Sequence, residues 1–306
     1  MTRSFTFLVN PASGGGAAPG AVLPVSRLLR EAGATVDVTY SPGPAAMAAL
    51  VTAAVDRGDV VVSVGGDGML SSLAGAVSLA GGTLAVLPAG RGNDFARMLG
   101  LPETPAEQAR LMLEGAVRRV DLVSWALPGP GSEPRRVAGS VYCGVDARAG
   151  QIVDRALRLP GKVQYPYAAL RALAGYRPAR FRVSVDGVAA EYTAANVVVA
   201  NSAYYGKGMK IAPSASVDDG LLEVVVIEAA SKLALMRSLP KVYDGEHVGL
   251  PEVTVLRGKR IELAADPLSG PEVPVGGDGE ALSVLPGLGA DPAVVEVLPA
   301  ALAVIA

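Results

Sequence analysis

The sequence has few residues of the kinds that build disulfides, metal centres and nucleic-acid surfaces. Among its 306 residues, Cys143 is the single cysteine and His247 the single histidine. One cysteine can form neither an internal disulfide nor a cysteine zinc site, which suits a reducing compartment, and one histidine excludes histidine-rich metal chemistry. The formal net charge of −2 argues against nucleic acid as a partner, because binding phosphates requires a surplus of lysine and arginine.

Long apolar segments are scarce as well. The apolar run at residues 5–9 is too short for the core of a signal peptide, so we expect a cytoplasmic protein. Residues 69–90 carry no charge, but Gly81, Gly82 and Pro88 divide them into a helix, a turn and a strand, which favours a folded core over a membrane span. Half of all residues are apolar, and the length allows two domains.

The first 120 residues alternate between short apolar strands and helices. Strands are expected at residues 5–9, 34–40, 60–64 and 83–87, with helices between them and a further helix from Asp94. This order predicts a parallel sheet that is covered on both faces and binds ligands beyond the carboxyl ends of its strands. Polar loops that contain glycine follow three of these strands, at residues 9–16, 64–68 and 87–94. We therefore expect the three loops to converge on one edge of the sheet.

After about Leu122, strands with alternating apolar residues follow one another. Phe181, Val183 and Val185 would lie on one face of such a strand, and the next two residues, Asp186-Gly187, predict a hairpin turn. The expected fold class is therefore α/β, with an N-terminal parallel-sheet nucleotide-binding domain and a C-terminal β-sandwich-like domain. We place these domains at residues 1–122 and 123–290, followed by a C-terminal segment, 291–306, that could return to the first domain.

The glycine loops have a composition suited to binding anions. Glycines after a strand let backbone N–H groups approach an anion closely, and the N-terminus of the next helix adds partial positive charge. Gly65-Gly66-Asp67-Gly68 occupies such a place, but the chain contains neither a G-x-x-x-x-G-K-[ST] nor a G-x-G-x-x-G motif. Taken alone, this loop is explained equally well as a phosphate cradle or as a tight turn.

Five motifs considered together indicate a function more specifically than this single loop does. In chain order they are NPASGGG at 10–16, VGGDGML at 64–70, PAGRGNDFAR at 88–97, GMKIAPSASVDDGLLEV at 208–224 and GDGEAL at 277–282. Their content and order resemble the diacylglycerol kinase catalytic-domain family, which includes bacterial diacylglycerol kinases, sphingosine kinases and ceramide kinases. The resemblance implies a two-domain lipid kinase that binds ATP and Mg²⁺ in its cleft. A lipid hydroxyl, such as that of diacylglycerol, would attack the γ-phosphoryl group.

The resemblance also implies roles for individual residues. The nucleotide-binding set would be Asn10, Ser13, Gly14, Gly65, Gly66, Gly68, Gly90, Arg91, Asn93 and Asp94. Asp67 would organise Mg²⁺ and water for catalysis. Asp278 and Glu280 would activate the acceptor hydroxyl, because a carboxylate within hydrogen-bond reach can accept its proton. The candidate metal ligands are Asp67, Asp121, Asp218 and Asp219.

Some of these carboxylates also have ordinary structural explanations. Asp94 is suited to cap the helix that follows it, which is compatible with nucleotide binding. Asp121 would serve equally well as a turn residue at a strand end. For Asp218 and Asp219, a hairpin turn is favoured over a structural Mg²⁺ site.

The sequence departs from the family pattern in its loops. Met69 and Arg91 stand where relatives have threonine, Ser71 and Ser72 where they commonly have asparagine and glutamate, and Gly15-Gly16 where a lysine is common. Each lost hydrogen bond is worth on the order of 0.5–3 kcal/mol, although the Arg91 guanidinium could compensate by binding phosphate. A kinase remains the favoured interpretation. The alternatives are a non-catalytic relative that binds nucleotide or lipid, and an NAD kinase-like enzyme, whose superfamily shares the Gly-Gly-Asp-Gly loop.

A basic stretch at residues 148–182 suggests contact with a membrane. It contains eight lysines and arginines against Asp154 alone, interleaved with three tyrosines. Basic residues favour an anionic leaflet and tyrosine favours the interface, but a solvated helix face beside buried tyrosines explains the pattern equally well. We expect a lipid substrate, no nucleic-acid partner and peripheral association with the inner membrane face. The sequence leaves open whether the chain forms a homodimer.

Overall fold

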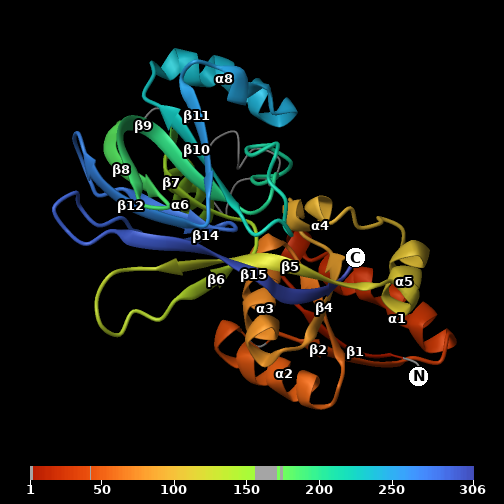
Figure 1. Cartoon of the computed structure of the whole chain (residues 1–306). Coiled ribbons are helices and arrows are strands. Elements are labelled where there is room, and N and C mark those ends of the chain that lie inside the picture. The colour runs from red at the N-terminus through yellow and green to blue at the C-terminus, as the bar shows by residue number, and fades with distance from the viewer. Residues whose placement is uncertain (1–2, 42, 156–170, 173–174) are drawn as a thin grey trace.

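The computed structural model describes residues 3–41, 43–155, 171–172 and 175–306, which form two units joined through shared strands (Figure 1). The helices and strands are β1 (Ser4–Val9), η1 (Ser13–Gly15), α1 (Ala18–Glu31), β2 (Thr35–Tyr40), α2 (Pro44–Asp56), β3 (Val60–Gly65), α3 (Asp67–Ala80), β4 (Thr83–Pro88), α4 (Asp94–Met98), α5 (Pro105–Glu114), β5 (Val117–Ala126), β6 (Arg135–Val137), β7 (Ser140–Gly144), α6 (Val145–Arg155), β8 (Ala179–Val185), β9 (Val188–Ala200), β10 (Leu222–Glu228), α8 (Lys232–Asp244), η2 (Glu246–Gly249), β11 (Val253–Gly258), β12 (Arg260–Pro267), β13 (Pro274–Gly277), β14 (Glu280–Val284) and β15 (Ala293–Ile305). The predicted α/β class is confirmed.

The N-terminal unit is built on a parallel sheet. β1 pairs with β2 and β3, and β3 pairs with β4, all in the parallel direction. Every residue of β3 is buried, which explains its nearly continuous apolar sequence. On one face Val51 of α2 and Leu73 of α3 pack into the core, and on the other Leu29 of α1 and Met112 of α5 do so. No helix within the described ranges is both long and apolar enough to span a membrane.

The C-terminal unit is β-sandwich-like, as predicted, and β9 links its sheets. The first half of β9 pairs with β8, and its second half lies between β7 and β10, in antiparallel register throughout. Side chains from these strands and from β12 meet in a core that includes Trp125 and Phe181. Asp186 and Gly187 have φ angles of 49° and 88°, so the predicted hairpin turn between β8 and β9 is confirmed.

β15 connects the two units. It pairs with β12 in the C-terminal unit, with β4 in the N-terminal unit and with β5 along most of its length. Its register shifts between Leu298 and Leu302, and at this bulge the N–H of Ala300 donates to Asp121 Oδ1 at 2.7 Å. β15 therefore contains most of the expected C-terminal segment, residues 291–306. β5 runs through residue 122, where the boundary between the domains was expected.

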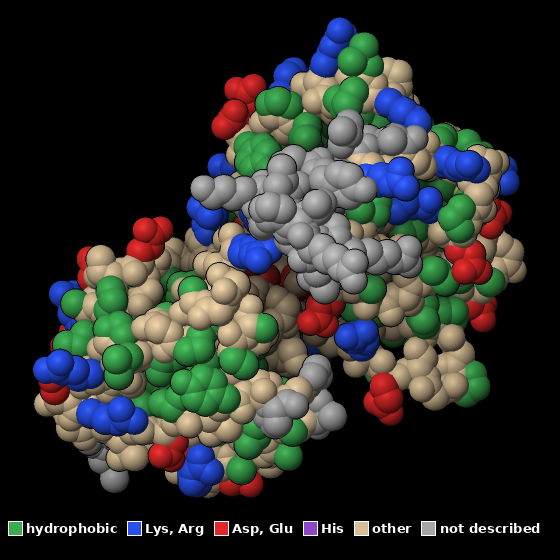
Figure 2. Space-filling model, turned by 180° about the vertical axis from the view of Figure 1, so that it is seen from behind, with side chains coloured by type: hydrophobic (Ala, Val, Ile, Leu, Met, Phe, Trp, Pro, Cys, Tyr) green, Lys and Arg blue, Asp and Glu red, His purple; other side chains and the backbone are tan. Residues whose placement is uncertain are grey.

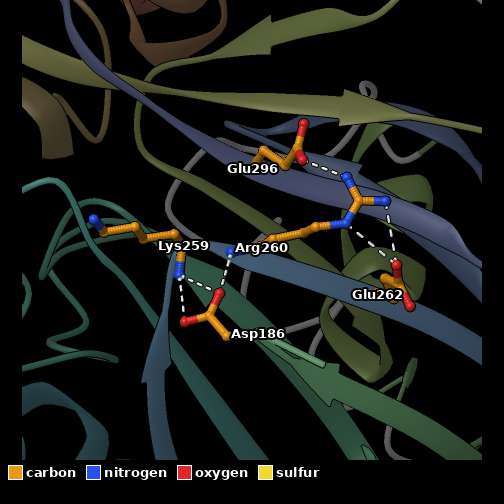
Figure 3. Close-up of polar contacts among 5 residues, drawn as sticks. All are labelled: Asp186, Lys259, Arg260, Glu262 and Glu296. Carbon is orange, nitrogen blue, oxygen red and sulfur yellow. Dashed lines mark hydrogen bonds and ion pairs between the residues drawn. The ribbon is translucent and has the colours of Figure 1, made fainter. Parts of the chain in front are cut away.

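A polar network holds the turns of the C-terminal unit together (Figure 3). The Asp186 carboxylate accepts the backbone N–H groups of Lys259 and Arg260, at 3.0 and 2.9 Å. These bonds hold the pKa of Asp186 below its usual range. The Arg260 guanidinium pairs with Glu262 at 3.2 Å and with Glu296 of β15. The β8–β9 turn is thereby fixed against the β11–β12 turn.

Candidate active site

Three glycine-containing loops meet beyond the carboxyl ends of β1, β3 and β4, as the sequence predicts. A Cβ atom at Gly90 would lie 2.3 Å from Gly66 Cα, so the loops after β3 and β4 touch through their backbones. Gly14, at φ 64°, approaches the third loop in the same way, because its Cβ would lie 2.5 Å from the Ala89 carbonyl oxygen. Side chains at these positions would push the loops apart, which is why glycine is required there.

Polar side chains fix the shape of these loops. Asn10 Oδ1 accepts the backbone N–H of Ala12 at 3.0 Å. Asn93 has a left-handed φ of 56°, and its side chain accepts the Gly90 N–H at 2.9 Å and donates to the Gly90 carbonyl at 3.2 Å. Ser13 faces the second loop, because its Oγ would lie 3.2 Å from a Cβ at Gly65. These contacts fix the loop backbones where they line the adjoining cavity.

Arg91 and Lys207 bring two positive charges to the loops. Arg91 reaches the first loop, where its Nη2 would lie 3.8 Å from a Cβ at Gly15. Lys207 comes from the segment between β9 and β10, and its backbone has a left-handed φ of 71°. Burial, and then repulsion from Arg91, lower the pKa of Lys207. Two cations held close enough to repel each other favour the binding of an anion between them.

Three carboxylates, those of Asp67, Asp94 and Asp278, lie close enough to influence one another. Asp67 begins α3 and Asp94 begins α4. Burial, and then the charge of Asp94, raise the pKa of Asp67 to about 6, and Asp278 adds to the effect. Burial also raises the pKa of Asp94, whose carboxylate accepts the N–H groups of Lys207 at 2.8 Å and Gly208 at 2.6 Å. Asp94 thereby joins the two units across the site.

The Asp278 carboxylate is surrounded by backbone donors. The successive N–H groups of Ala138, Gly139 and Ser140 donate to it at 2.8, 3.0 and 2.9 Å. A Cβ at Gly139 would lie only 2.7 Å from Asp278 Oδ1, so glycine permits this approach. Burial raises the pKa of Asp278, and the Ser71 hydroxyl and the amide donors oppose that shift. The carboxylate therefore anchors the turn between β13 and β14.

A cavity of about 800 Å³ adjoins these groups. The N-terminal unit lines it with the glycine loops, Asp67 and Arg91. Glu280 of β14 overhangs the second loop, because its Oε1 would lie 2.9 Å from a Cβ at Gly68. The C-terminal unit supplies apolar walls from Met209, Ile211, Ile227, Leu235, Leu239 and Val242. The cavity therefore combines a polar, charged part with an apolar part.

A buried polar cluster forms another part of the cavity wall. The Asp146 carboxylate accepts hydrogen bonds from the Tyr205 hydroxyl and from the Asn196 side-chain amide. Burial raises the pKa of Asp146. Tyr142 packs edge to face on Tyr205, with ring centroids 5.8 Å apart, and its hydroxyl accepts the Gly279 N–H at 3.0 Å. The cluster thus connects the cavity wall to the turn that carries Asp278.

Asp121 lies at the junction of the two units rather than in the cavity. Its carboxylate accepts the N–H of Gly220 at 2.8 Å and the N–H of Ala300 at 2.7 Å. Its own backbone N–H donates to the Val217 carbonyl at 2.6 Å. These bonds tie β5 to the β15 bulge and to the segment before β10.

Asp218 and Asp219 lie apart from Asp67 as well. Asp218 pairs with Arg118 at 3.8 Å, and Asp219 pairs with Arg257 of β11. Within the described residues, no group of three or more histidine, cysteine, aspartate or glutamate side chains is arranged to hold a metal ion. Of the four predicted metal ligands, Asp67 is the one that lines the cavity.

Sequence reasoning missed Lys207 and Asp146. The available signal for Lys207 is its position between Gly206 and Gly208, in a loop that follows a buried strand. Asp146 has no such signal, because its partners Tyr205 and Asn196 are distant in the chain. Of the basic stretch expected to contact a membrane, residues 156–170 and 173–174 lie outside the described residues.

Known families match both units. Residues 4–125 match the diacylglycerol kinase catalytic domain, and residues 139–306 match the YegS C-terminal NAD kinase beta sandwich-like domain. The chain belongs to the diacylglycerol kinase-like lipid kinases. It is 34% identical to a diacylglycerol kinase of Mycobacterium tuberculosis (strain ATCC 25618 / H37Rv), over 96% of this chain and 94% of that protein. The resemblance drawn from the sequence motifs is therefore confirmed.

More distant relatives also match most of the chain. A diacylglycerol kinase of Bacillus subtilis (strain 168) is 24% identical, over 77% of this chain and 75% of that protein. Two solved structures described as diacylglycerol kinases of Bacillus anthracis strain Sterne superpose with TM-scores of 0.78 and 0.69, at 21% and 19% identity. Both comparisons cover 99% of this chain and 97% of the solved chain. The arrangement of the two units is therefore that of solved family structures.

Proposed function

We propose that this lipid kinase transfers the γ-phosphoryl group of ATP, with the help of Mg²⁺, to a hydroxyl group of a membrane lipid such as diacylglycerol. The observation that carries the proposal is the composition of the cavity. Glycine loops, two cations and five carboxylates line the cavity together with apolar walls. Phosphoryl transfer depends on positioning and charge neutralisation, and a lipid acceptor requires apolar surroundings for its chains.

The loop residues fit a nucleotide triphosphate. Gly14, Gly66 and Gly90 bring three loop backbones together without side chains, which leaves room for phosphate oxygens close to the loops. Arg91 and Lys207 would bind those oxygens, which would relieve the repulsion that adds to burial in lowering the pKa of Lys207. Arg91 would thus replace the threonine hydroxyl of relatives with a stronger, charged donor.

The carboxylates fit Mg²⁺ as a partner of the nucleotide. Asp67 and Asp94 offer oxygen ligands beside the loops, and Mg²⁺ in phosphoryl-transfer sites uses one or two carboxylates together with waters and phosphates. When bound there, the ion would neutralise charge on the phosphates. The raised pKa of Asp67 supports this role, since a nearby cation would favour the ionised carboxylate.

Glu280 is the better placed of the two predicted bases. Its carboxylate lies beside Gly68 and lines the cavity. The oxygens of Asp278 already accept three backbone N–H groups of the turn before β7, so they are engaged in holding the fold. We assign Glu280 to the acceptor hydroxyl and assign Asp278 to fixing the turn that presents Glu280.

The test is phosphate transfer from labelled ATP with Mg²⁺ to mixed micelles that contain diacylglycerol, ceramide or a long-chain base. Wild type should label one of these lipids, and Asp67→Ala and Glu280→Gln should each abolish labelling. Asp56→Ala, at an exposed carboxylate near the end of α2, serves as the matched control and should keep full activity. Wild-type labelling that survives Asp67→Ala would refute the assigned site.

A second candidate, a nucleotide-binding protein without turnover, rests on Met69. The Met69 sulfur would lie 3.0 Å from a Cβ at Gly65, so a thioether packs against the loop where relatives have a hydroxyl. This candidate predicts that wild type binds ATP but labels no lipid, and that Met69→Thr gains transfer. Transfer by the wild type would exclude it.

A further inference from the structure

α8 is exposed along most of its length although it carries large apolar side chains. Of the thirteen large hydrophobic side chains that are exposed among the described residues, four lie on this 13-residue helix: Leu233, Met236, Leu239 and Tyr243, at 51%, 39%, 39% and 51% exposure. Val242 is the one residue of the helix that is buried. Monomeric proteins rarely gather exposed apolar side chains in this way unless the surface binds something.

The exposed residues form a stripe that continues into the cavity. At 3.6 residues per turn, Leu233, Met236 and Tyr243 fall on one side of the helix. The neighbouring side lines the cavity with Leu235, Ser238, Leu239, Val242 and Tyr243. Leu239 and Tyr243 belong to both sets, since they are exposed and line the cavity. An apolar path therefore leads from the outer surface of α8 into the cavity.

The charges on α8 are mainly positive. Lys232, Arg237 and Lys241 are exposed, and Asp244 at the end of the helix is its one acidic residue. Arg237 and Lys241 are four residues apart, so they lie on the same flank of the apolar stripe. Figure 2 shows hydrophobic and basic side chains together at the end of the molecule that α8 forms in Figure 1. This is the composition of a helix that lies in a membrane interface.

We propose that α8 docks on an anionic lipid bilayer, with its apolar stripe among the headgroups and its basic flank on their phosphates. A lipid acceptor would then pass along Leu239 and Tyr243 into the cavity. The basic flank complements an anionic surface, and the stripe ends at a cavity with apolar walls. These two observations favour a bilayer over a protein partner. The acceptor route rests on the proposed lipid-kinase function, whereas the docking surface stands on α8 itself.

Vesicle sedimentation tests the docking surface. The full chain is mixed with vesicles of phosphatidylglycerol and phosphatidylcholine, and separately with vesicles of phosphatidylcholine alone. Wild type should bind the anionic vesicles and lose binding as salt rises. Leu233→Ser/Met236→Ser should weaken binding about tenfold or more, because two apolar side chains no longer enter the interface. Arg237→Glu/Lys241→Glu should weaken binding to anionic vesicles only.

The matched control is Val188→Ser/Leu268→Ser, which removes two exposed apolar side chains far from α8 in sequence, at 78% and 52% exposure. It should bind vesicles as the wild type does. Circular dichroism and thermal melts would establish that each variant is folded. Absence of vesicle binding by wild type, or equal loss in the control, would overturn the proposal. So would a wild-type dimer that Leu233→Ser/Met236→Ser dissociates, because a second copy would then cover the stripe.

Transfer to a short-chain diacylglycerol dispersed without vesicles separates this proposal from the proposed function. Leu233 and Met236 do not line the cavity, so their variant should retain wild-type transfer to this acceptor. Vesicle binding without any transfer would support α8 docking and refute the lipid-kinase function. Loss of transfer to the dispersed acceptor in Leu233→Ser/Met236→Ser would indicate a damaged cavity, and would overturn the assignment of α8 to docking.

Discussion

Asp67 and Asp94 meet across Gly92, where a Cβ atom would lie 2.8 Å from Asp67 Oδ2 and 3.3 Å from Asp94 Oδ2. Repulsion from Asp94 adds to burial in raising the pKa of Asp67 to about 6. Ionising such a carboxylate at neutral pH destabilises the folded state. The pair therefore holds charge repulsion that a bound cation would relieve, which is typical of functional sites.

Replacing Asp67 by asparagine should stabilise the cation-free protein at neutral pH. The folded-state pKa of about 6 lies above the unfolded value of 3.8, so wild-type stability falls as pH rises between these values. In EDTA at about pH 8, Asp67→Asn should raise the free energy of unfolding by up to about 3 kcal/mol, at about 1.4 kcal/mol per pKa unit. The gain should shrink toward zero near pH 4. Urea unfolding followed by Trp125 fluorescence measures it.

Asp56→Asn provides the control for this experiment. Asp56 is exposed near the end of α2, so its replacement should leave stability unchanged at both pH values. A gain in Asp67→Asn that is the same at both pH values would mean that ionisation of the Asp67 carboxyl is not its cause.

Gly90→Ala should separate the loops after β3 and β4. The added methyl group would lie 2.3 Å from Gly66 Cα, a backbone atom that cannot rotate away. We expect a loss of about 1–3 kcal/mol in the free energy of unfolding and a loss of ATP binding. The control is Gly20→Ala in α1, where an added Cβ meets nothing within 4 Å. It should leave stability unchanged or raise it by up to about 1 kcal/mol, and it should bind ATP normally. Calorimetry measures both properties, and normal ATP binding by Gly90→Ala would contradict the predicted contact.

The fold was accessible from sequence because its signals are local. The buried run of β3, the Asp186-Gly187 turn and the loops after β1, β3 and β4 each follow from residues that are adjacent in the chain. The path of β15 is different, because it pairs with β4, β5 and β12, which lie far from it in sequence. No periodicity in residues 291–306 encodes those partners.

The site was accessible where glycine and polar residues cluster in one motif. Asp67 and Asp94 lie in such motifs, and the structure brings them together. Lys207 enters the same site from the other unit through N–H contacts to Asp94, and sequence separation hides this pairing. Asp121 shows the opposite case. It was expected as a metal ligand, but its carboxylate accepts two backbone N–H groups at the junction of the two units.

Arg91 and Lys207 should each contribute to ATP affinity. Hydrogen bonds to charged groups are worth about 1.5–3 kcal/mol, so Arg91→Ala and Lys207→Ala should each raise the Kd for ATP by roughly ten- to a hundredfold. Arg110→Ala, at an exposed position on α5, should leave the Kd unchanged. Isothermal titration calorimetry gives the three values. Wild-type affinity in both cavity variants would rule out the phosphate site between them.

Substitution of Asp121 tests whether this residue holds the junction of the two units together or binds a metal ion. Asp121→Ala would leave the N–H groups of Gly220 and Ala300 without their acceptor, so we expect a loss of about 1–3 kcal/mol in the free energy of unfolding. Asp121→Asn keeps one acceptor oxygen and should lose less, and Asp218→Ala, at an exposed ion pair, should lose little. Because the partners of Asp121 are backbone amides, the loss should be equal in Mg²⁺ and in EDTA. If wild type were instead stabilised by Mg²⁺ and Asp121→Ala removed only that increment, Asp121 would be a metal ligand and its role at the junction would be wrong.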